Sequence, residues 1–262
     1  MKRCTFEGQD RLRTAPCPDA RWLTQLQLWR PDDPDVLTTG DVETAVILLS
    51  GTFDLMGGST AWPARGARQT PFSGRPMAVF LPKNTPFRTQ RGQGEILLVA
   101  ARQPEAPAPR QGRGVFGQSP LLQLAGSGKA FDPTTGEWRP AETFPTAAES
   151  LPPRRMTQLQ VGAYVVERVF AGDYKAATLS VDEVVLPAGQ RLAVADIPGR
   201  PRADELLVFV RTAATATVAS AGQAMAANGD AAFCVAMPGQ PDVSITAEGS
   251  PAYVVLAYAG KG

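Results

Sequence analysis

Two stretches of the chain, TGDVETAVILLSGTFDLMGG (39–58) and PFSGRPMAVFLPKNTPFRTQRGQGEILLVAAR (71–102), decide the expected fold. They contain three apolar segments, at 43–49, 77–81 and 94–101, rich in valine, isoleucine, leucine and phenylalanine. Serine–glycine, glycine–glycine and proline-rich turns separate these segments. Short apolar runs bounded by such turns are typical of strands in a sandwich or barrel. The sequence therefore predicts an antiparallel β-barrel.

The composition extends this prediction to the whole chain of 262 residues. Apolar residues make up 44% of the chain, and its 24 prolines and 25 glycines suit many tight turns between short strands. A chain of this length forms either one large β domain or two domains of ordinary size. We expect an all-β protein.

The charge pattern argues against several classes of partner. The formal net charge is +1, and the arginines are scattered along the chain, so we expect no nucleic-acid partner. The opening residues, MKRCTFEGQDRL, lack the apolar segment of a secretory signal. The apolar runs are far shorter than the ~20 residues that cross a bilayer. We expect a cytoplasmic protein that does not enter a membrane.

The chain contains no histidine. This excludes Ser-His-Asp and Cys-His catalytic triads and every histidine-ligated metal site. The three cysteines, Cys4, Cys17 and Cys234, show no C-x-x-C spacing, so we expect neither a disulfide framework nor a thiolate zinc site. Cys234 lies in an apolar run, which predicts a buried, unreactive thiol.

Changes in composition divide the chain into four parts. Residues 1–21 are polar and are expected to form an irregular N-terminal arm, followed by a first barrel over 22–103. Residues 104–153, rich in proline, alanine and arginine, read as a linker with packing loops, and 154–262 as a second barrel. Strands are expected at 22–29, 43–49, 52–56, 77–81, 86–90 and 94–101, and then at 158–170, 176–186, 205–210, 215–219, 231–236, 243–246 and 252–258.

The two halves repeat one pattern. ETAVILLSGTFDL (43–55) parallels DELLVFVRTAATATV (204–218). AVFLPKNTPFRTQRGQGEILLVAA (78–101) parallels AFCVAMPGQPDVSITAEGSPAYVVLAYA (232–259). In both pairs an apolar strand ends in a proline-containing turn, and a polar strand and a glycine turn lead to a second apolar strand. This internal repeat predicts two tandem small β-barrels.

The second half resembles the cupin superfamily in two motifs. LPAGQRLAVADIPGRPRADELLVFVRTAATATV (186–218) resembles the first motif, with Gly189 at its turn and Glu205 at the position of its carboxylate ligand. NGDAAFCVAMPGQPDVSITAEG (228–249) resembles the second, with Asp242 at the position of its histidine. The resemblance implies a bicupin, a tandem double-stranded β-helix made of two jelly-roll barrels.

The first half is similar to the N-terminal barrel of 5-deoxy-glucuronate isomerases, which are bicupins of inositol catabolism. The shared features are a Thr-Gly-Asp entry (39–41), a strand ending in Leu-Ser-Gly (49–51), a Phe-x-Gly-x-Pro turn (72–76) and a strand into Leu-Pro-x-x-Thr-Pro (81–86). The resemblance covers residues 22–103. In that family, histidines and a glutamate of the second barrel hold a metal, and those histidines have no counterparts here.

Oxygen donors stand near the family's ligand positions at Asp196, Glu205 and Asp242. Such a set suits calcium, magnesium or manganese rather than the metal of a histidine site. The alternative is that Glu205 and Asp242 are solvated or paired with Arg200 or Arg202. We expect no metal and no other cofactor, and a weak oxygen-ligated divalent cation remains the alternative.

Two functions stay open. In an aldose–ketose isomerase acting on a sugar acid, Glu205 would be the base and Arg202 or Lys175 the electrophile that holds the enediolate. A non-catalytic bicupin would instead bind a small carbohydrate-like or acidic ligand, or serve in assembly. The ligand-binding candidates are Asp196, Glu205, Asp242 and Tyr164. We expect a small sugar-acid ligand and a homodimer formed by pairing of edge strands.

Overall fold

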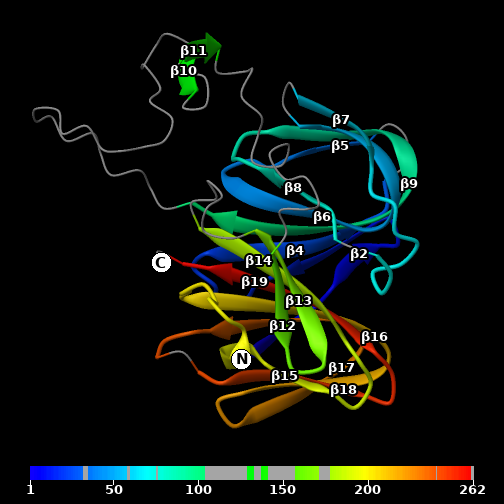
Figure 1. Ribbon diagram of the computed structural model, residues 1–262, viewed down its shortest axis with the longest axis vertical. Helices are drawn as coiled ribbons and strands as arrows, with labels where there is room; N and C mark the ends of the chain where they lie inside the picture. The colour runs from blue at the N-terminus through cyan, green and yellow to red at the C-terminus, as the bar shows by residue number, and fades with distance from the viewer. Residues whose placement is uncertain are drawn as a thin grey trace, which may run out of the picture.

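The computed structural model describes residues 1–31, 35–57, 60–74, 76–103, 129–132, 137–140, 157–170, 178–239 and 241–260. These residues form strands, turns and one short 3-10 helix. Two large sheets curl into two barrels, stacked one against the other (Figure 1). A separate two-stranded sheet pairs β10 (Lys129–Asp132) with β11 (Glu137–Pro140). The all-β prediction is confirmed. No helix among the described residues has the length and apolar character that a membrane span requires.

The N-terminal barrel is built from an eight-stranded sheet with the order β2-β3-β4-β9-β6-β7, in which β5 also pairs with β9 and β8 with β6. Its strands are β2 (Glu7–Gln9), β3 (Leu12–Pro16), β4 (Leu23–Trp29), β5 (Asp35–Thr38), β6 (Val42–Gly57), β7 (Thr60–Arg65), β8 (Ala78–Leu81) and β9 (Pro86–Arg102).

The C-terminal barrel is built from a nine-stranded sheet with the order β1-β17-β16-β19-β14-β13-β12, in which β18 pairs with β15 and β16. Its elements are β1 (Lys2–Cys4), β12 (Thr157–Val161), β13 (Tyr164–Phe170), β14 (Leu179–Leu186), β15 (Arg191–Ala193), the 3-10 helix η3 (Val194–Asp196), β16 (Glu205–Ser220), β17 (Gln223–Ala236), β18 (Val243–Glu248) and β19 (Ala252–Ala259).

The two sheets repeat one topology. The path β2-β3-β4-β9-β6-β7 has its counterpart in β12-β13-β14-β19-β16-β17. The single strand β9 corresponds to β18 and β19 together, and β7 and β8 together correspond to β17. The predicted internal repeat is therefore present in the strand pairing itself.

Several strands differ from the expected ones for local reasons. Strands β6 and β9 run on where the sequence predicts breaks, because Gly51 and Gly94 lie opposite each other at positive φ. A Cβ at Gly51 would stand 1.8 Å from the carbonyl oxygen of Gln93, so only glycine allows this close pairing. Conversely, the predicted single strand 158–170 is a hairpin that turns at Gly162, also at positive φ.

The N-terminal residues 1–21 are not irregular, as the polar sequence suggests, but contain three short strands. Strands β2 and β3 extend the N-terminal barrel beyond β4, whereas β1 pairs with β17 of the C-terminal barrel. Sequence patterns miss β1 because three residues are too few to show a period. The chain thus begins in the barrel in which it ends.

Both faces of the central strands are buried, and successive residues face opposite sides. On β9, Leu97 and Val99 pack in a core between the barrels that also contains Phe209 of β16. The intervening Ile96 and Leu98 pack inside the N-terminal barrel instead. Strand β19 follows the same alternation, and all of its residues are buried. The two barrels therefore share one apolar core, to which aligned sheet faces contribute from both sides.

A buried carboxylate from the C-terminal barrel binds the start of β4. Glu205, the first residue of β16, is 7% exposed. One of its oxygens accepts a hydrogen bond from the backbone N–H of Arg21, and the other accepts from Trp22 (2.9 Å) and Leu23 (2.8 Å). Three backbone donors that the barrel interface would otherwise leave unpaired are thereby satisfied.

The N-terminal barrel returns the same interaction. Glu43 of β6, the counterpart of Glu205 in the repeat, is fully buried. Its Oε1 accepts hydrogen bonds from the backbone N–H groups of Thr178 (2.9 Å) and Leu179 (2.7 Å), where β14 begins. Each barrel therefore holds the first strand residues of the other through a carboxylate, and we call Glu43 and Glu205 the reciprocal carboxylates.

Arg68 adds a buried ion pair across the same interface. It lies between β7 and β8, donates from Nε to the carbonyl oxygen of Leu48 (2.8 Å), and pairs with Glu183 of β14. Burial raises the pKa of Glu183, although the Arg68 charge opposes this rise. The hydroxyl of Tyr253 lies 3.5 Å from the same guanidinium.

An ionic network at the rim also joins the barrels. Arg211 of β16 binds Asp230 of β17 through Nε (2.6 Å) and a terminal nitrogen (3.0 Å), and it also pairs with Glu95 of β9. Arg13 of β3 binds the same Asp230 at 2.5 Å. Burial opposes the ionisation of Asp230, but the two arginines outweigh it and hold the pKa of this carboxyl below its usual value.

We expect Glu205→Ala to lower the free energy of unfolding by about 3 kcal/mol or more, because it leaves buried backbone N–H groups without an acceptor. Urea unfolding measures this change. Glu7→Ala is the matched control, because Glu7 is an exposed glutamate on the edge strand β2 and should change stability by less than about 0.5 kcal/mol. Equal effects of the two variants would contradict the assigned role.

Acid should weaken the ionic network. A carboxyl whose pKa is lowered in the folded state stabilises the fold above its unfolded pKa, near 3.8, and loses this contribution as the pH falls through its folded pKa. The stability difference between the wild type and Asp230→Asn should therefore be present at pH 7 and should shrink below about pH 4. Urea titrations at a series of pH values test this, and a difference independent of pH would refute it.

Candidate functional site

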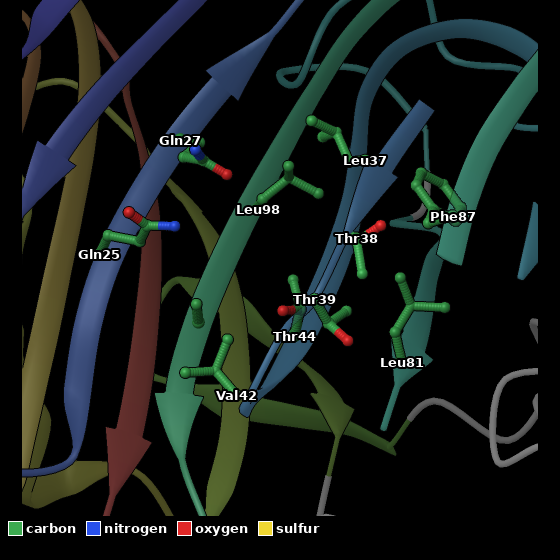
Figure 2. Close-up of a pocket in the computed structure, with 11 residues that line it drawn as sticks. Gln25, Gln27, Leu37, Thr38, Thr39, Val42, Thr44, Leu81, Phe87 and Leu98 are labelled. Carbon is green, nitrogen blue, oxygen red and sulfur yellow. The ribbon is translucent and has the colours of Figure 1, made fainter. Parts of the chain in front are cut away.

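A cavity of about 110 Å³ opens inside the N-terminal barrel. Five strands (β4, β5, β6, β8 and β9) and the turn after β5 supply its wall, and Figure 2 shows their side chains converging from neighbouring strands. The lining residues are Gln25, Gln27, Leu37, Thr38, Thr39, Val42, Thr44, Leu81, Phe87, Leu98 and Ala100. The wall of the cavity thus combines glutamine amides and threonine hydroxyls with apolar side chains.

Strand alternation explains how these side chains reach the interior. A register shift between Leu23 and Gln25 sets the second half of β4, so that Gln25 and Gln27 line the cavity while Leu26 packs in the core between the barrels. On β6, Thr44 lines the cavity, and its neighbour Ala45 packs between the barrels.

Some of the polar groups in the cavity are engaged by the protein and others are not. The Thr39 hydroxyl accepts from the backbone N–H of Thr85 (2.9 Å) and donates to Pro82 O (2.9 Å). The amide nitrogen of Gln27 donates to the Thr14 hydroxyl at 3.2 Å. Within the described residues, the Gln25 amide and the Thr44 hydroxyl make no side-chain hydrogen bond. These two groups remain available to a ligand.

The interior of the C-terminal barrel is filled by its own side chains. Leu206, Val208 and Val210 of β16 pack there against Val254 and Leu256 of β19, all at 0% exposure. At one end, Asp182 of β14 is neutralised by Arg168, with contacts of 3.0 Å and 3.3 Å. Burial raises the pKa of Asp182 despite this arginine. Among the described residues, the cavity inside a barrel is therefore that of the N-terminal barrel, and the hollow lined by Arg191, Gly222 and Asp242 beside the C-terminal barrel is more open to solvent.

The resemblance to isomerases implies a metal in the C-terminal barrel, and the side chains described there do not fit one. The chain has no histidine. Among the described residues, no three Cys, Asp or Glu side chains are gathered in a way that would hold a metal ion. Asp196, Glu205 and Asp242 thus do not form a ligand set.

Glu205 shares the face of Leu207 and Phe209, which lies against the N-terminal barrel. Its side chain consequently points away from the interior of its own barrel, and its oxygens are bound to backbone N–H groups. The expected base or ligand is in this structure an interface residue.

Three other candidates gather around Arg191 at one end of the C-terminal barrel. The Tyr164 hydroxyl donates to the Arg191 carbonyl (3.0 Å), and a terminal nitrogen of Arg191 lies 3.7 Å from Asp242. Burial, and next the charge of Asp196, raise the pKa of Tyr164. The Asp242 side chain is 68% exposed, so this group lies at the surface rather than in a closed site.

Of the two proposed electrophiles, Arg202 and Lys175, only Arg202 is among the described residues. Arg202 is exposed in the loop before β16. Lys175 lies outside the described residues. Among the described residues, Arg202 and Glu205 form neither a hydrogen bond nor an ion pair with each other.

The cavity residues were not among the sequence-based candidates. The alternation W-L-T-Q-L-Q-L-W over residues 22–29 already places two glutamines on one face of a strand. One face of β4 packs against the other barrel, and the opposite face points into its own barrel. The alternation of the sequence alone does not show on which of these two faces the glutamines lie. The polar face of β4 is the sequence signal that could have indicated this site.

Comparison with known proteins agrees with the predicted resemblance. Residues 24–114 match the KduI/IolB family. No curated protein matches the chain. The fold is similar to that of an IolB-like protein from Salmonella typhimurium LT2, at 14% identity and a TM-score of 0.63, covering 94% of this chain and 92% of that one.

Two further solved structures share the fold. The oxalate decarboxylase of Lactobacillus farciminis, in a formate complex, has 10% identity and a TM-score of 0.58, covering 99% of this chain and 84% of that one. AerE from Microcystis aeruginosa has 8% identity and a TM-score of 0.56, covering 98% of both chains. The predicted tandem cupin barrels are confirmed.

Proposed function

We propose, from the match of residues 24–114 to the KduI/IolB family and from the cavity they partly enclose, that this protein binds a small, uncharged, polar molecule in its N-terminal barrel. The observation that carries the proposal is the set of unengaged polar groups, Gln25 and Thr44, on a wall otherwise formed by apolar carbon. A few polar groups within an apolar pocket are the usual arrangement of a small-molecule site.

The charge of the lining favours a neutral ligand over an acid. None of the eleven lining residues carries a charge. A carboxylate enclosed there would lose its hydration without gaining a positive partner, which is strongly unfavourable. Of the two ligand classes expected from the sequence, carbohydrate-like and acidic, the cavity therefore supports the carbohydrate-like one.

The size of the cavity restricts the ligand further. A cavity of about 150 Å³ accommodates benzene, so 110 Å³ encloses a molecule or a part of a molecule with no more than about six non-hydrogen atoms. Hydroxyl or carbonyl groups would bond to Gln25 and Thr44, and the carbon chain would lie against Leu98 and Phe87. Dihydroxyacetone and glycerol have suitable size and chemistry as probes.

The second candidate function is aldose–ketose isomerisation of a sugar acid, which the family match favours. It would require Glu205 to act as a base, with Arg202 or Lys175 as the electrophile. The engagement of Glu205 by three backbone donors weighs against this function, because a base needs a free lone pair within reach of the substrate proton.

Binding should depend on the Thr44 hydroxyl. We expect Thr44→Val to weaken binding of dihydroxyacetone about 2- to 10-fold, since one hydrogen bond is lost at nearly unchanged shape. We expect Ala100→Leu to abolish binding by filling the cavity. NMR titration measures both, and Thr52→Val, the same substitution on β6 outside the cavity, is the control. Tighter binding of glycerate than of dihydroxyacetone would contradict a neutral site.

The isomerase candidate has its own test. We expect no conversion of 5-deoxy-glucuronate by the purified protein, either alone or with added manganese, zinc or magnesium, because Glu205 is engaged in the interface. Product formation followed by NMR decides this. Turnover that Glu205→Gln abolishes, in a variant that still unfolds cooperatively, would replace the binding proposal by the isomerase.

A further inference from the structure

The three cysteines of the chain, far apart in sequence, meet at one place. Cys4 lies on β1 and Cys234 on the adjacent β17, where Cys4 pairs with Ala232 and Lys2 with Cys234. Residues two apart on a strand share a face, so Cys4 and Cys234 are diagonal neighbours on one side of the sheet. Both thiols are free and buried, and both belong to the core between the barrels.

Cys17 is brought to the same face by the segment that links β3 to β4. Its backbone N–H donates to the Thr24 carbonyl (2.9 Å), which closes a turn before β4. Asp19, two residues further, forms an ion pair with Lys2, the residue that pairs with Cys234. Cys17 is 8% exposed and belongs to the same core as the other two cysteines.

The three thiols influence one another's ionisation, which agrees with their common place in the core between the barrels. A hydrogen bond from the Cys17 thiol lowers the pKa of Cys4 against the opposing effect of burial, and the backbone of Cys234 lowers it further. Hydrogen bonds to Cys234 and Cys4, with burial, raise the pKa of Cys17. Cys4 thus ionises more readily than Cys17.

We propose that Cys4, Cys17 and Cys234 form a reversible thiol–disulfide site in which Cys17 is one partner of every disulfide that forms. The metal alternative is disfavoured, because no three such donors in the described part of the chain are arranged to hold an ion. The reactant is a low-molecular-weight disulfide. Nothing in the proposed ligand-binding function requires or excludes this site.

The reaction balances as a thiol–disulfide exchange. The Cys4 thiolate attacks one sulfur of the small disulfide, forms a mixed disulfide and releases one small thiolate, which takes up a proton. The Cys17 sulfur then attacks the Cys4 sulfur and gives its proton to the second small thiolate as this leaves, so that a Cys4–Cys17 bond forms and a small thiol is released. In total, two protein thiols are oxidised and one small disulfide is reduced to two thiols. Attack by Cys234 on Cys17 then moves the bond to Cys17–Cys234 and restores the Cys4 thiol.

Access to the buried thiols comes through strand β1. This strand has only three residues, and Lys2 and Arg3 are exposed at the edge of the sheet. Short edge strands with few contacts open at little free-energy cost, and opening of β1 exposes Cys4 first. A disulfide from Cys17 to Cys234 would fasten the segment before β4 to the C-terminal barrel.

The test uses the full chain, treated with oxidised glutathione, alkylated and digested, with disulfides located by mass spectrometry. We expect Cys4–Cys17, Cys17–Cys234 or both, reversed by dithiothreitol, and a rise in Tm on oxidation of about 5 °C or more. Cys4→Ala should retain the Cys17–Cys234 bond, and Cys234→Ala the Cys4–Cys17 bond.

Cys17→Ala should form no intramolecular disulfide, and its cooperative thermal unfolding shows whether it is folded. The wild type itself, compared in its reduced and oxidised forms, tests the proposal independently of any variant. A Cys4–Cys234 bond in the wild type or in Cys17→Ala would overturn the proposal, as would three thiols that remain free after β1 has been given time to open.

Discussion

The reciprocal carboxylates are the constraint on which the two-barrel arrangement depends. Glu43 and Glu205 each occupy the same position in the repeat, and each accepts hydrogen bonds from the first residues of a strand in the other barrel. Strands that start inside an apolar interface leave donors that water does not reach. One carboxylate accepts hydrogen bonds from two or three of these donors at once. It can do so only when the two barrels pack against each other in one fixed position.

The duplication has produced two barrels with one topology and different interiors. In the C-terminal barrel, β16 and β19 fill the interior with aliphatic side chains, and the buried Asp182 is neutralised by Arg168. In the N-terminal barrel, Gln25 and Thr44 leave polar groups facing a cavity. The filled C-terminal barrel contributes packing and a sheet face to the interface, and the cavity lies in the N-terminal barrel.

The sequence was sufficient to predict the β class, the tandem repeat and the resemblance of the first half to the KduI/IolB family, because turn residues and alternation are local signals. It was not sufficient for the site. Glu205 stands at a ligand position of its motif. A shift of one residue along the strand turns a side chain from the inside of the barrel to the outside, and the motif alone does not show which side Glu205 takes. The meeting of Cys4, Cys17 and Cys234 depends on β1 crossing to the far barrel, and three residues carry no pattern that would reveal such a pairing.

Strand β1 also has a consequence for the order of synthesis. Lys2 to Cys4 leave the ribosome more than two hundred residues before the partner strand β17 is made. At about 5–20 residues per second, the N-terminal strand waits roughly 10–50 s for its partner. The C-terminal barrel is consequently completed by a strand that is made long before its partner, and any segment joined to Met1 would start at the edge of that barrel.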